Sequence, residues 1–220
     1  MPSIRHLPAI LLLAVVSACS GQPGQAPPAT ASAAGTPAAQ VDWPEMAAFW
    51  ERASALPGID TGPANAQKRM VVYFDPHCPV CARQWAVLRP YMDEVRIHWV
   101  PVAYIDASSA RVAAALLSAP DPAAALASNE QAFDFDAGKG GYLPEREPTE
   151  SAIEQVKQNT RRAMKSGDLS GTPTLGFELI RDQRYYRMVG LLDAEAARVA
   201  VGDLGNTWDP WAKRGGGKRN

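Results

Sequence analysis

The sequence has little cysteine and histidine, and it has no excess of charge of either sign. Its 220 residues include 22 Lys and Arg against 23 Asp and Glu, for a formal net charge of -1. This balance, with no basic block among aromatic residues, does not favour the positive surface that binds DNA or RNA. The sequence also has no internal repeat and no second Cys-x-x-Cys motif. We therefore expect no nucleic-acid partner, no bound metal and no cofactor.

Long hydrophobic runs are also missing. The apolar run from Leu7 to Val16 is about half the roughly 20 residues that a membrane-spanning helix needs, which argues against a permanent transmembrane helix. Arg5 and His6 precede this run, and small residues follow it. This order is typical of a secretory signal peptide, which we place at residues 1–18.

The residues after the apolar run read Val16-Ser17-Ala18-Cys19. They resemble the lipobox of bacterial lipoproteins, in which the cysteine is lipidated and becomes the first residue of the mature chain. The resemblance implies a lipid anchor on Cys19, and Ser20 after it favours the outer membrane. An ordinary cleavage site near Ala18 is the alternative. We expect a protein of the Gram-negative periplasm that is held at the membrane by this lipid.

The rest of the chain divides by composition. Residues 20–40 are almost wholly Gly, Pro, Ala, Ser, Thr and Gln, so residues 19–40 are predicted to be the lipidated cysteine and a flexible tether. Residues 41–67 should form a helix, from near Asp42 to about Ala55, and a loop. Residues 68–204 are predicted to be the main folded domain. Residues 205–220 are a tail, whose Trp208 and Trp211 have no assigned role.

Alternating strand and helix signals in residues 68–204 predict an α/β fold. Pro90 predicts a kink in the helix expected at Ala82 to Val95. Pro101 suggests that the strand expected at Arg96 to Ile105 is an edge strand or carries a bulge. The predicted segments are a buried strand at Met70 to Phe74, a helix at Ala82 to Val95, a strand at Arg96 to Ile105, a helical insertion at about 107–165, an antiparallel strand pair at Thr174 to Ile180 and Arg184 to Val189, and a helix at Asp193 to about Val201.

The segment at residues 75–81, Asp-Pro-His-Cys-Pro-Val-Cys, directly follows the first of these strands. A zinc site would need further ligands, for which His77 and His98 are available. A purely structural disulfide over so short a loop would stabilise the fold weakly. At a helix start, however, the sulfur of Cys78 would lie beside unpaired backbone N–H groups, which favour a thiolate, and Cys81 would follow one turn later. The position therefore favours thiol-disulfide exchange.

Two motifs carry a resemblance to a known family. Phe74 to Cys81 matches the pattern FxDPxCPxC, with the phenylalanine directly before the aspartate here, and Gly171-Thr172-Pro173-Thr174 follows the helical insertion. In this order they resemble the DsbC and DsbG group of periplasmic thiol-disulfide interchange proteins, and the DsbG type most. The resemblance spans about Trp43 to Leu204. It implies a thioredoxin-like fold, a central mixed β-sheet flanked by helices, with a helical insertion that caps the active site.

The resemblance also implies roles for individual residues. Cys78 would be the attacking thiolate and Cys81 the resolving thiol. Thr172 and Pro173 would form a loop that faces the active site, with Pro173 cis and the Thr172 hydroxyl near the sulfur. A simple turn before a strand is the alternative for this loop.

Neighbouring residues would modulate the cysteine pair. Pro79 suits the first helical turn, and Val80 departs from the tyrosine of the DsbG-type motif, so the redox potential and substrate preference are left open. His77 would lower the pKa of Cys78 if it is protonated, or it is a solvent-facing bystander. Asp75 is interpreted as a turn-forming residue rather than a proton carrier.

The isomerases of this family carry an N-terminal dimerisation domain, which we do not expect in this chain. We therefore predict a monomeric, membrane-anchored thiol-disulfide oxidoreductase that reduces or isomerises disulfides, or rescues oxidised cysteines, in envelope proteins. Such an enzyme needs an electron donor, which the sequence does not identify. The alternative is a non-catalytic lipoprotein that uses the same scaffold for docking, with its disulfide permanently closed.

Overall fold

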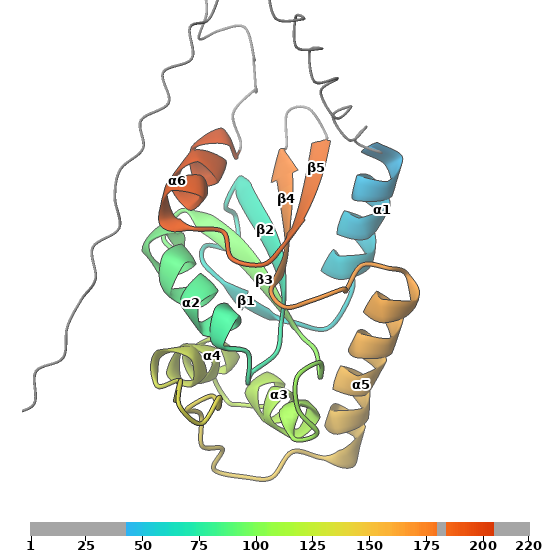
Figure 1. Cartoon of the computed structure of the whole chain (residues 1–220), viewed down its shortest axis with the longest axis vertical. Helices are drawn as coiled ribbons and strands as arrows, with labels where there is room; N and C mark the ends of the chain where they lie inside the picture. Colours follow the sequence, from blue (N-terminus) through green and yellow to red (C-terminus); the bar gives the residue numbers. More distant parts are fainter. Residues whose placement is uncertain (1–42, 180–183, 205–220) are drawn as a thin grey trace, which may run out of the picture. The chain divides into compact units, whose positions relative to one another are not determined.

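The computed structural model of the chain describes residues 43–179 and 184–204, and their core is a five-stranded sheet (Figure 1). The strands follow the order β1-β3-β2-β4-β5, in which β2 and β3 are parallel and every other neighbouring pair is antiparallel. The strands are β1 (Ile59–Thr61), β2 (Lys68–Phe74), β3 (Val95–Pro101), β4 (Thr174–Leu179) and β5 (Arg184–Val189). The helices are α1 (Trp43–Ser54), α2 (Pro79–Leu88), the 3₁₀ turn η1 (Arg89–Tyr91), α3 (Ser109–Leu117), α4 (Pro122–Gln131), α5 (Glu150–Lys165) and α6 (Ala194–Asp203).

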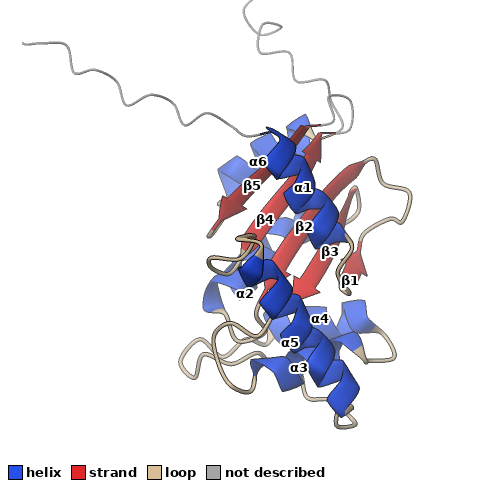
Figure 2. Ribbon diagram, turned by 90° about the vertical axis from the view of Figure 1, so that its right-hand side faces the viewer, coloured by secondary structure: helices blue, strands red, loops and turns tan. Residues whose placement is uncertain are grey.

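Helices cover both faces of the sheet because β2 is apolar on both sides (Figures 1 and 2). Met70, Val72 and Phe74 pack in one buried cluster with residues of α2, α4 and α6. Val71 and Tyr73 alternate with them and pack in a second cluster with residues of α1 and α5. Successive side chains of a strand point to opposite faces, so the continuous apolar run of β2 makes it the central strand of a two-sided core. The predicted mixed α/β fold is thereby confirmed.

The predicted helix after the cysteine motif is shorter than expected. It begins at Pro79 and ends at Leu88, and Arg89–Tyr91 form a 3₁₀ turn. The predicted kinked helix as far as Val95 is wrong, because Pro90 lacks the N–H that would continue the hydrogen-bond ladder. The chain instead turns directly into β3.

The loop predicted between Leu56 and Gln67 contains a strand that the sequence analysis missed. Ile59–Thr61 pair antiparallel with residues 97–99 of β3. The prediction that Pro101 marks an edge strand is also wrong, because β3 lies between β1 and β2. Pro101 is the last residue of β3, where a missing N–H costs little.

The strand predicted at Arg96 to Ile105 is present as β3 but ends at Pro101. The other predicted elements are confirmed. The insertion contains α3, α4 and α5, β4 and β5 form the antiparallel pair, and Asp193 caps α6. No helix among the described residues is long and apolar enough to cross a bilayer. The predictions for the signal peptide, Cys19, the tether and the tail lie outside the described residues.

One glycine allows the close approach of α1 to the sheet. A Cβ atom at Gly176 of β4 would lie 2.6 Å from a ring carbon of Phe49 and 2.6 Å from a methyl carbon of Val71. Both of these side chains are fully buried in the core on the α1 face. Glycine at this position therefore lets the Phe49 ring rest directly on the strand.

Candidate active site

The two cysteines lie at the N-terminus of α2, at the carboxyl end of the central strand β2. Cys78 is the N-cap, with extended backbone angles of φ -89° and ψ 113°, and Pro79 opens the helix. The backbone N–H of Cys81 donates to the sulfur of Cys78 across 3.4 Å. The cap position thus directs the unpaired N–H groups of the first turn toward the Cys78 sulfur.

These donors favour the anionic form of Cys78. Hydrogen bonding from Cys81 is the main cause that lowers the pKa of Cys78 from 9.0 to about 6, against the opposing effect of burial. The Thr172 side chain and the backbone N–H groups of Cys81 and Val80 lower the pKa further. Cys78 is therefore largely a thiolate at neutral pH, which is the reactive form of the side chain.

Cys81 has the opposite character. It is 1 % exposed, and burial raises its pKa well above the ordinary value, as do the neighbouring Cys78 and the charge of Glu130. No disulfide joins the two residues in the structure. The two side chains therefore differ at neutral pH, because Cys78 is largely ionised whereas Cys81 keeps its proton.

The loop before β4 covers the Cys78 sulfur. The Thr172–Pro173 peptide bond is cis, as predicted, and the sulfur of Cys78 lies 3.4 Å from the Thr172 carbonyl oxygen, to which it donates when it is protonated. The Thr172 hydroxyl is buried at this sulfur and helps to lower the pKa of Cys78, although it makes no hydrogen bond of standard geometry among the described residues. The N–H of Gly190 donates to the carbonyl oxygen of Pro173 at 2.8 Å, which ties the loop to the end of β5. The loop thus forms one wall of the site.

Asp75 joins the cysteine segment to the insertion. Its fully buried carboxylate accepts from the N–H of His77 (2.8 Å), the Ser109 hydroxyl (2.9 Å) and the N–H groups of Tyr104 (2.7 Å) and Ile105 (2.9 Å). The first of these bonds makes the turn that was predicted for Asp75. The other three fix the chain after β3 against the cysteine segment, so Asp75 is a structural anchor with its acceptor capacity filled.

His77 faces the insertion and not solvent. Its Nδ1 accepts from the N–H of Gly140 at 3.2 Å, so its Nε2 carries the proton in the neutral ring and donates to the Ser108 hydroxyl at 3.1 Å. The side chain is 4 % exposed, which contradicts the solvent-facing alternative. Burial and the nearby Lys139 lower the pKa of His77. A neutral His77 packs the 139–141 segment against the site and brings no positive charge to Cys78.

A buried carboxyl group from the insertion, which the sequence analysis missed, also lies at this site. Glu130 near the end of α4 is 5 % exposed, and its Oε1 accepts from the Asn129 amide at 3.0 Å. The same Asn129 nitrogen donates to the carbonyl oxygen of Pro76 at 3.0 Å. Burial raises the pKa of Glu130 to about 8, and the charges of Cys78 and Asp75 contribute to the rise. The sequence gives no signal for this placement, because Glu130 is remote from the motif along the chain.

A second buried amide secures the helix that carries the cysteines. The Gln84 side chain of α2 accepts from the N–H of Leu192 at 2.7 Å and donates to its carbonyl oxygen at 3.3 Å. Gln84 is fully buried. These two hydrogen bonds fix α2 to the segment that follows β5. The end of β5 pairs with the start of β4, next to the cis-proline loop.

The structure gives no support to a zinc site at the motif. Within residues 43–179 and 184–204, no three His, Cys, Asp or Glu side chains gather so as to hold a metal ion. His98 binds Asp60 through Nδ1 and the carbonyl oxygen of Leu56 through Nε2, both at 2.9 Å. Both histidines that might have completed a zinc site are thus engaged elsewhere.

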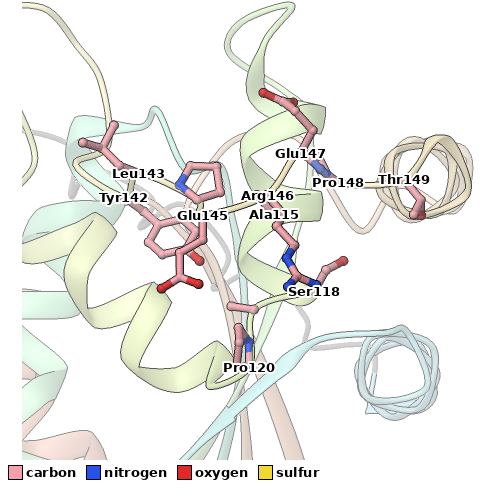
Figure 3. A pocket seen from close by; sticks show the side chains of 12 residues that line it. Ala115, Ser118, Pro120, Tyr142, Leu143, Glu145, Arg146, Glu147, Pro148 and Thr149 are labelled. Carbon is pink, nitrogen blue, oxygen red and sulfur yellow. The ribbon is translucent and has the colours of Figure 1, made fainter.

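A surface groove of about 460 Å³ lies beside the site, between α3 and the segment that leads to α5 (Figure 3). Tyr142 and Arg146 line it from that segment, and Ser118 lines it from the end of α3. The cysteines do not line this groove. It is linked to the site through the N–H of Tyr142, which donates to the Asn129 side chain at 3.4 Å.

A Cys-x-x-Cys pair at the start of a helix after a central strand, opposite a cis-proline loop, defines the thioredoxin-like class of folds. Solved structures of thioredoxin-like proteins superpose on this chain. The catalytic domain of Proteus mirabilis ScsC superposes with a TM-score of 0.57 at 18% identity, over 73% of this chain and 97% of that one. A periplasmic thioredoxin-like protein from Salmonella enterica gives a TM-score of 0.55 at 17% identity, over 72% of this chain and 97% of that one.

Sequence similarity points to a particular group within that class. The chain is 29% identical to the thiol:disulfide interchange protein DsbG of Pseudomonas aeruginosa over 129 residues, 58% of this chain and 48% of that protein. It is 26% identical to DsbG of Escherichia coli over 159 residues, 70% of this chain and 61% of that protein. No protein-family model matches the chain. The matches confirm the resemblance to the DsbC and DsbG type of thiol-disulfide interchange protein, and they span only about half to three fifths of the relatives' length.

Proposed function

We propose that this chain is a thiol-disulfide oxidoreductase that acts on exported proteins in the bacterial cell envelope. The observation that carries the proposal is the asymmetry of the two thiols. The pKa of Cys78 is lowered to about 6, whereas that of Cys81 is raised. A difference of this kind assigns attack to Cys78 and resolution to Cys81.

The exchange takes place in two steps. The Cys78 thiolate attacks one sulfur of a substrate disulfide, forms a mixed disulfide and releases the other substrate sulfur as a thiolate. Cys81 then loses its proton and attacks Cys78, which closes the Cys78–Cys81 disulfide and releases the second substrate thiolate. The substrate gains two electrons, and an electron donor of the envelope must return two electrons to the pair. A substrate sulfenic acid would react with Cys78 to give the same mixed disulfide and water.

The geometry of the site favours an extended substrate segment. Cys78 as a whole residue is only 2 % exposed, and the cis-proline loop lies directly against its sulfur. An extended chain can pair with the exposed backbone of such a loop and bring its disulfide to Cys78. Val80 is half-buried next to the pair, where a side chain can tune both the potential and the fit of substrates.

The cellular setting forms part of the proposal. The periplasmic Salmonella protein and the signal-like N-terminus support an envelope location. We propose that the chain is a monomer anchored through lipidated Cys19 in the outer membrane. Mass spectrometry of the mature protein tests the anchor, because lipidation adds acyl chains to Cys19 and a Cys19→Ala chain stays unmodified. Sedimentation equilibrium tests the monomer.

Trapping of the mixed disulfide tests the activity. A Cys81→Ser chain is expected to accumulate mixed disulfides with envelope proteins and with oxidised glutathione, since nothing resolves them. A Cys78→Ser chain, with the buried thiol alone, should trap nothing. Redox titration of the wild-type chain against glutathione then gives a potential, which for such pairs ranges from about -270 to -120 mV, and its value separates an oxidant from a reductase or isomerase. A pair that stays closed under strongly reducing conditions would favour the docking role.

A further inference from the structure

The resolving step requires a proton acceptor that the cysteine motif does not supply. Cys81 is 1 % exposed, so its thiol has little access to bulk water and hydroxide. Asp75 is the nearest acidic residue along the chain, but its two carboxylate oxygens already accept four hydrogen bonds. His77 is also engaged, since its Nδ1 accepts from the backbone N–H of Gly140.

Glu130 alone among these buried groups has a vacant acceptor atom. Its Oε1 is bound by the Asn129 amide, whereas its Oε2 is buried without a hydrogen-bond partner among the described residues. A buried carboxyl oxygen without a partner is costly, so its retention at this place calls for a role. Glu130 lies close enough to Cys81 for its charge to act on that thiol. It belongs to α4, which packs against the cysteine helix α2 (Figure 1).

The position of Glu130 is secured from two sides. The Asn129 amide joins the Glu130 carboxylate to the carbonyl oxygen of Pro76, two positions before Cys78. The side-chain oxygen of Asn129 accepts from the N–H of Tyr142. The insertion therefore holds the carboxyl group in a fixed position beside the cysteine segment.

We infer that Glu130 is the proton acceptor for Cys81 when Cys81 resolves the mixed disulfide, directly or through one water molecule. This inference rests on the proposed oxidoreductase function and deepens it. The proton moves from the Cys81 sulfur to Oε2 of Glu130, and the Cys81 thiolate attacks the sulfur of Cys78. The Cys78–substrate bond breaks, and its electron pair leaves with the substrate thiolate. Glu130 then returns the proton to that thiolate or to solvent as the site opens.

The charges near Glu130 determine the stage of the reaction at which it can accept the proton. Burial is the main cause that opposes ionisation of Glu130, and the Cys78 thiolate and Asp75 add to it, so in the reduced enzyme the carboxyl group tends to keep its proton. Once Cys78 has joined the substrate, it no longer carries a charge, and Glu130 faces only Asp75 and the neutral Cys81 thiol. Glu130 thus becomes a base at the stage at which the base is needed.

A chromogenic aromatic disulfide, dithiobis-nitrobenzoate, separates the two steps in the full chain that carries Cys19→Ala, which removes the third cysteine. Attack by Cys78 releases one coloured thiolate, and resolution by Cys81 releases a second. In a Glu130→Gln chain we expect an unchanged first phase and a second phase slowed by at least about tenfold at pH 7, since proton transfer by a side chain contributes about 10²- to 10⁴-fold. The slowed phase should accelerate with every increase in pH, because in this chain hydroxide, which reaches the buried thiol only slowly, must take the proton. Glu130→Asp should restore part of the rate.

The matched control is Glu178→Gln. Glu178 is also a buried glutamate, and it pairs with Arg69 at the far end of β4 from the site. Its replacement should leave both phases unchanged. A Glu130→Gln chain whose second phase stays within about threefold of the wild type from pH 6 to 9 would overturn the inference. A wild-type chain that releases no coloured thiolate from Cys78 would instead overturn the oxidoreductase proposal itself.

A second measurement does not depend on the folding of that variant. Carbon NMR of the chain labelled at the glutamate carboxyl groups should show one carboxyl that titrates near pH 8. Its titration should move to lower pH in the mixed disulfide of the Cys81→Ser chain. A carboxyl that titrates identically in both forms would contradict the inference.

Discussion

The sulfur of Cys78 lies 3.4 Å from the carbonyl oxygen of Thr172, a residue 94 positions away in the chain. This contact brings the cis-proline loop onto the reactive thiol and places the buried Thr172 hydroxyl in the same site. The end of β2, the start of α2 and the start of β4 therefore meet at one sulfur atom. Because of this convergence, the chemistry of Cys78 depends on residues outside the Cys-x-x-Cys motif.

Alkylation should reveal the lowered pKa of Cys78. The rate of reaction of the reduced chain with iodoacetamide is expected to rise with pH through a midpoint of about 6. Cys81 should stay unmodified at neutral pH, because burial raises its pKa. Mass spectrometry of the digested chain assigns each site. A midpoint close to 9.0, the ordinary value, would show that the helix start does not stabilise the thiolate.

Replacing the Thr172 hydroxyl by a methyl group should weaken the thiolate. In a Thr172→Val chain we expect the pKa of Cys78 to rise by about one unit, which corresponds to about 1.4 kcal/mol. Thr174→Val is a suitable comparison, because the Thr174 hydroxyl bonds to the carbonyl oxygen of Gly171 and not to the sulfur. Thiolate absorbance in the ultraviolet follows both titrations. Equal midpoints for the two variants would assign no role to the Thr172 hydroxyl.

Removal of the Asp75 carboxylate should destabilise the whole domain. Asp75→Ala leaves the donors on His77, Ser109, Tyr104 and Ile105 without their acceptor, and we expect a loss of about 3 kcal/mol or more in the free energy of unfolding. Urea denaturation measures the change. Glu147→Ala, which removes an exposed ion pair with Arg111, should cost less than about 1 kcal/mol. Similar losses for the two variants would contradict the anchor role.

Glu130 should make the stability of the reduced chain depend on pH. Its pKa rises from 4.5 in the unfolded chain to about 8 in the folded one, so between these values the folded chain binds a proton that the unfolded chain has lost. Stability due to this group therefore falls as pH rises from about 5 to 8. The lowered pKa of Cys78 acts in the opposite direction above pH 6.

A Glu130→Gln chain isolates this effect, because Cys78 is common to both chains. The variant should gain stability relative to wild type as pH rises, by up to about 4 kcal/mol between pH 5 and 8. Urea denaturation of the reduced chains at several pH values measures the difference. A difference that does not change with pH would mean that Glu130 is ionised in the folded chain.

The glycine under Phe49 should resist substitution. Gly176→Ala places a methyl group 2.6 Å from carbons of Phe49 and Val71, and we expect a loss of about 1 to 3 kcal/mol. Gly202→Ala in α6 meets no atom within 4 Å and should stabilise the helix by about 0.5 to 1 kcal/mol. Thermal unfolding of the two variants gives the comparison. A Gly176→Ala chain as stable as wild type would show that α1 can shift away from the sheet.

The sequence by itself determined the local features of this protein. The apolar run of β2, the cysteine pair that follows it and the proline that opens α2 are neighbours along the chain, and short-range hydrogen bonds and backbone preferences act between them. The three helices of the insertion and the pairing of β4 with β5 could be predicted for the same reason.

Only the tertiary structure decided which distant groups surround the cysteines. The lengths of α2 and β1 depended on how the chain turns back beside β3, which local propensity does not encode. The placement of Glu130, the four bonds of Asp75 and the neutral state of His77 depended on α4 and the 139–141 segment packing onto the active-site helix. Contacts between residues far apart in the chain arise from the burial of whole faces, so the sequence motif predicted the nucleophile Cys78, and the fold placed Glu130, the proposed proton acceptor of Cys81, at the same site.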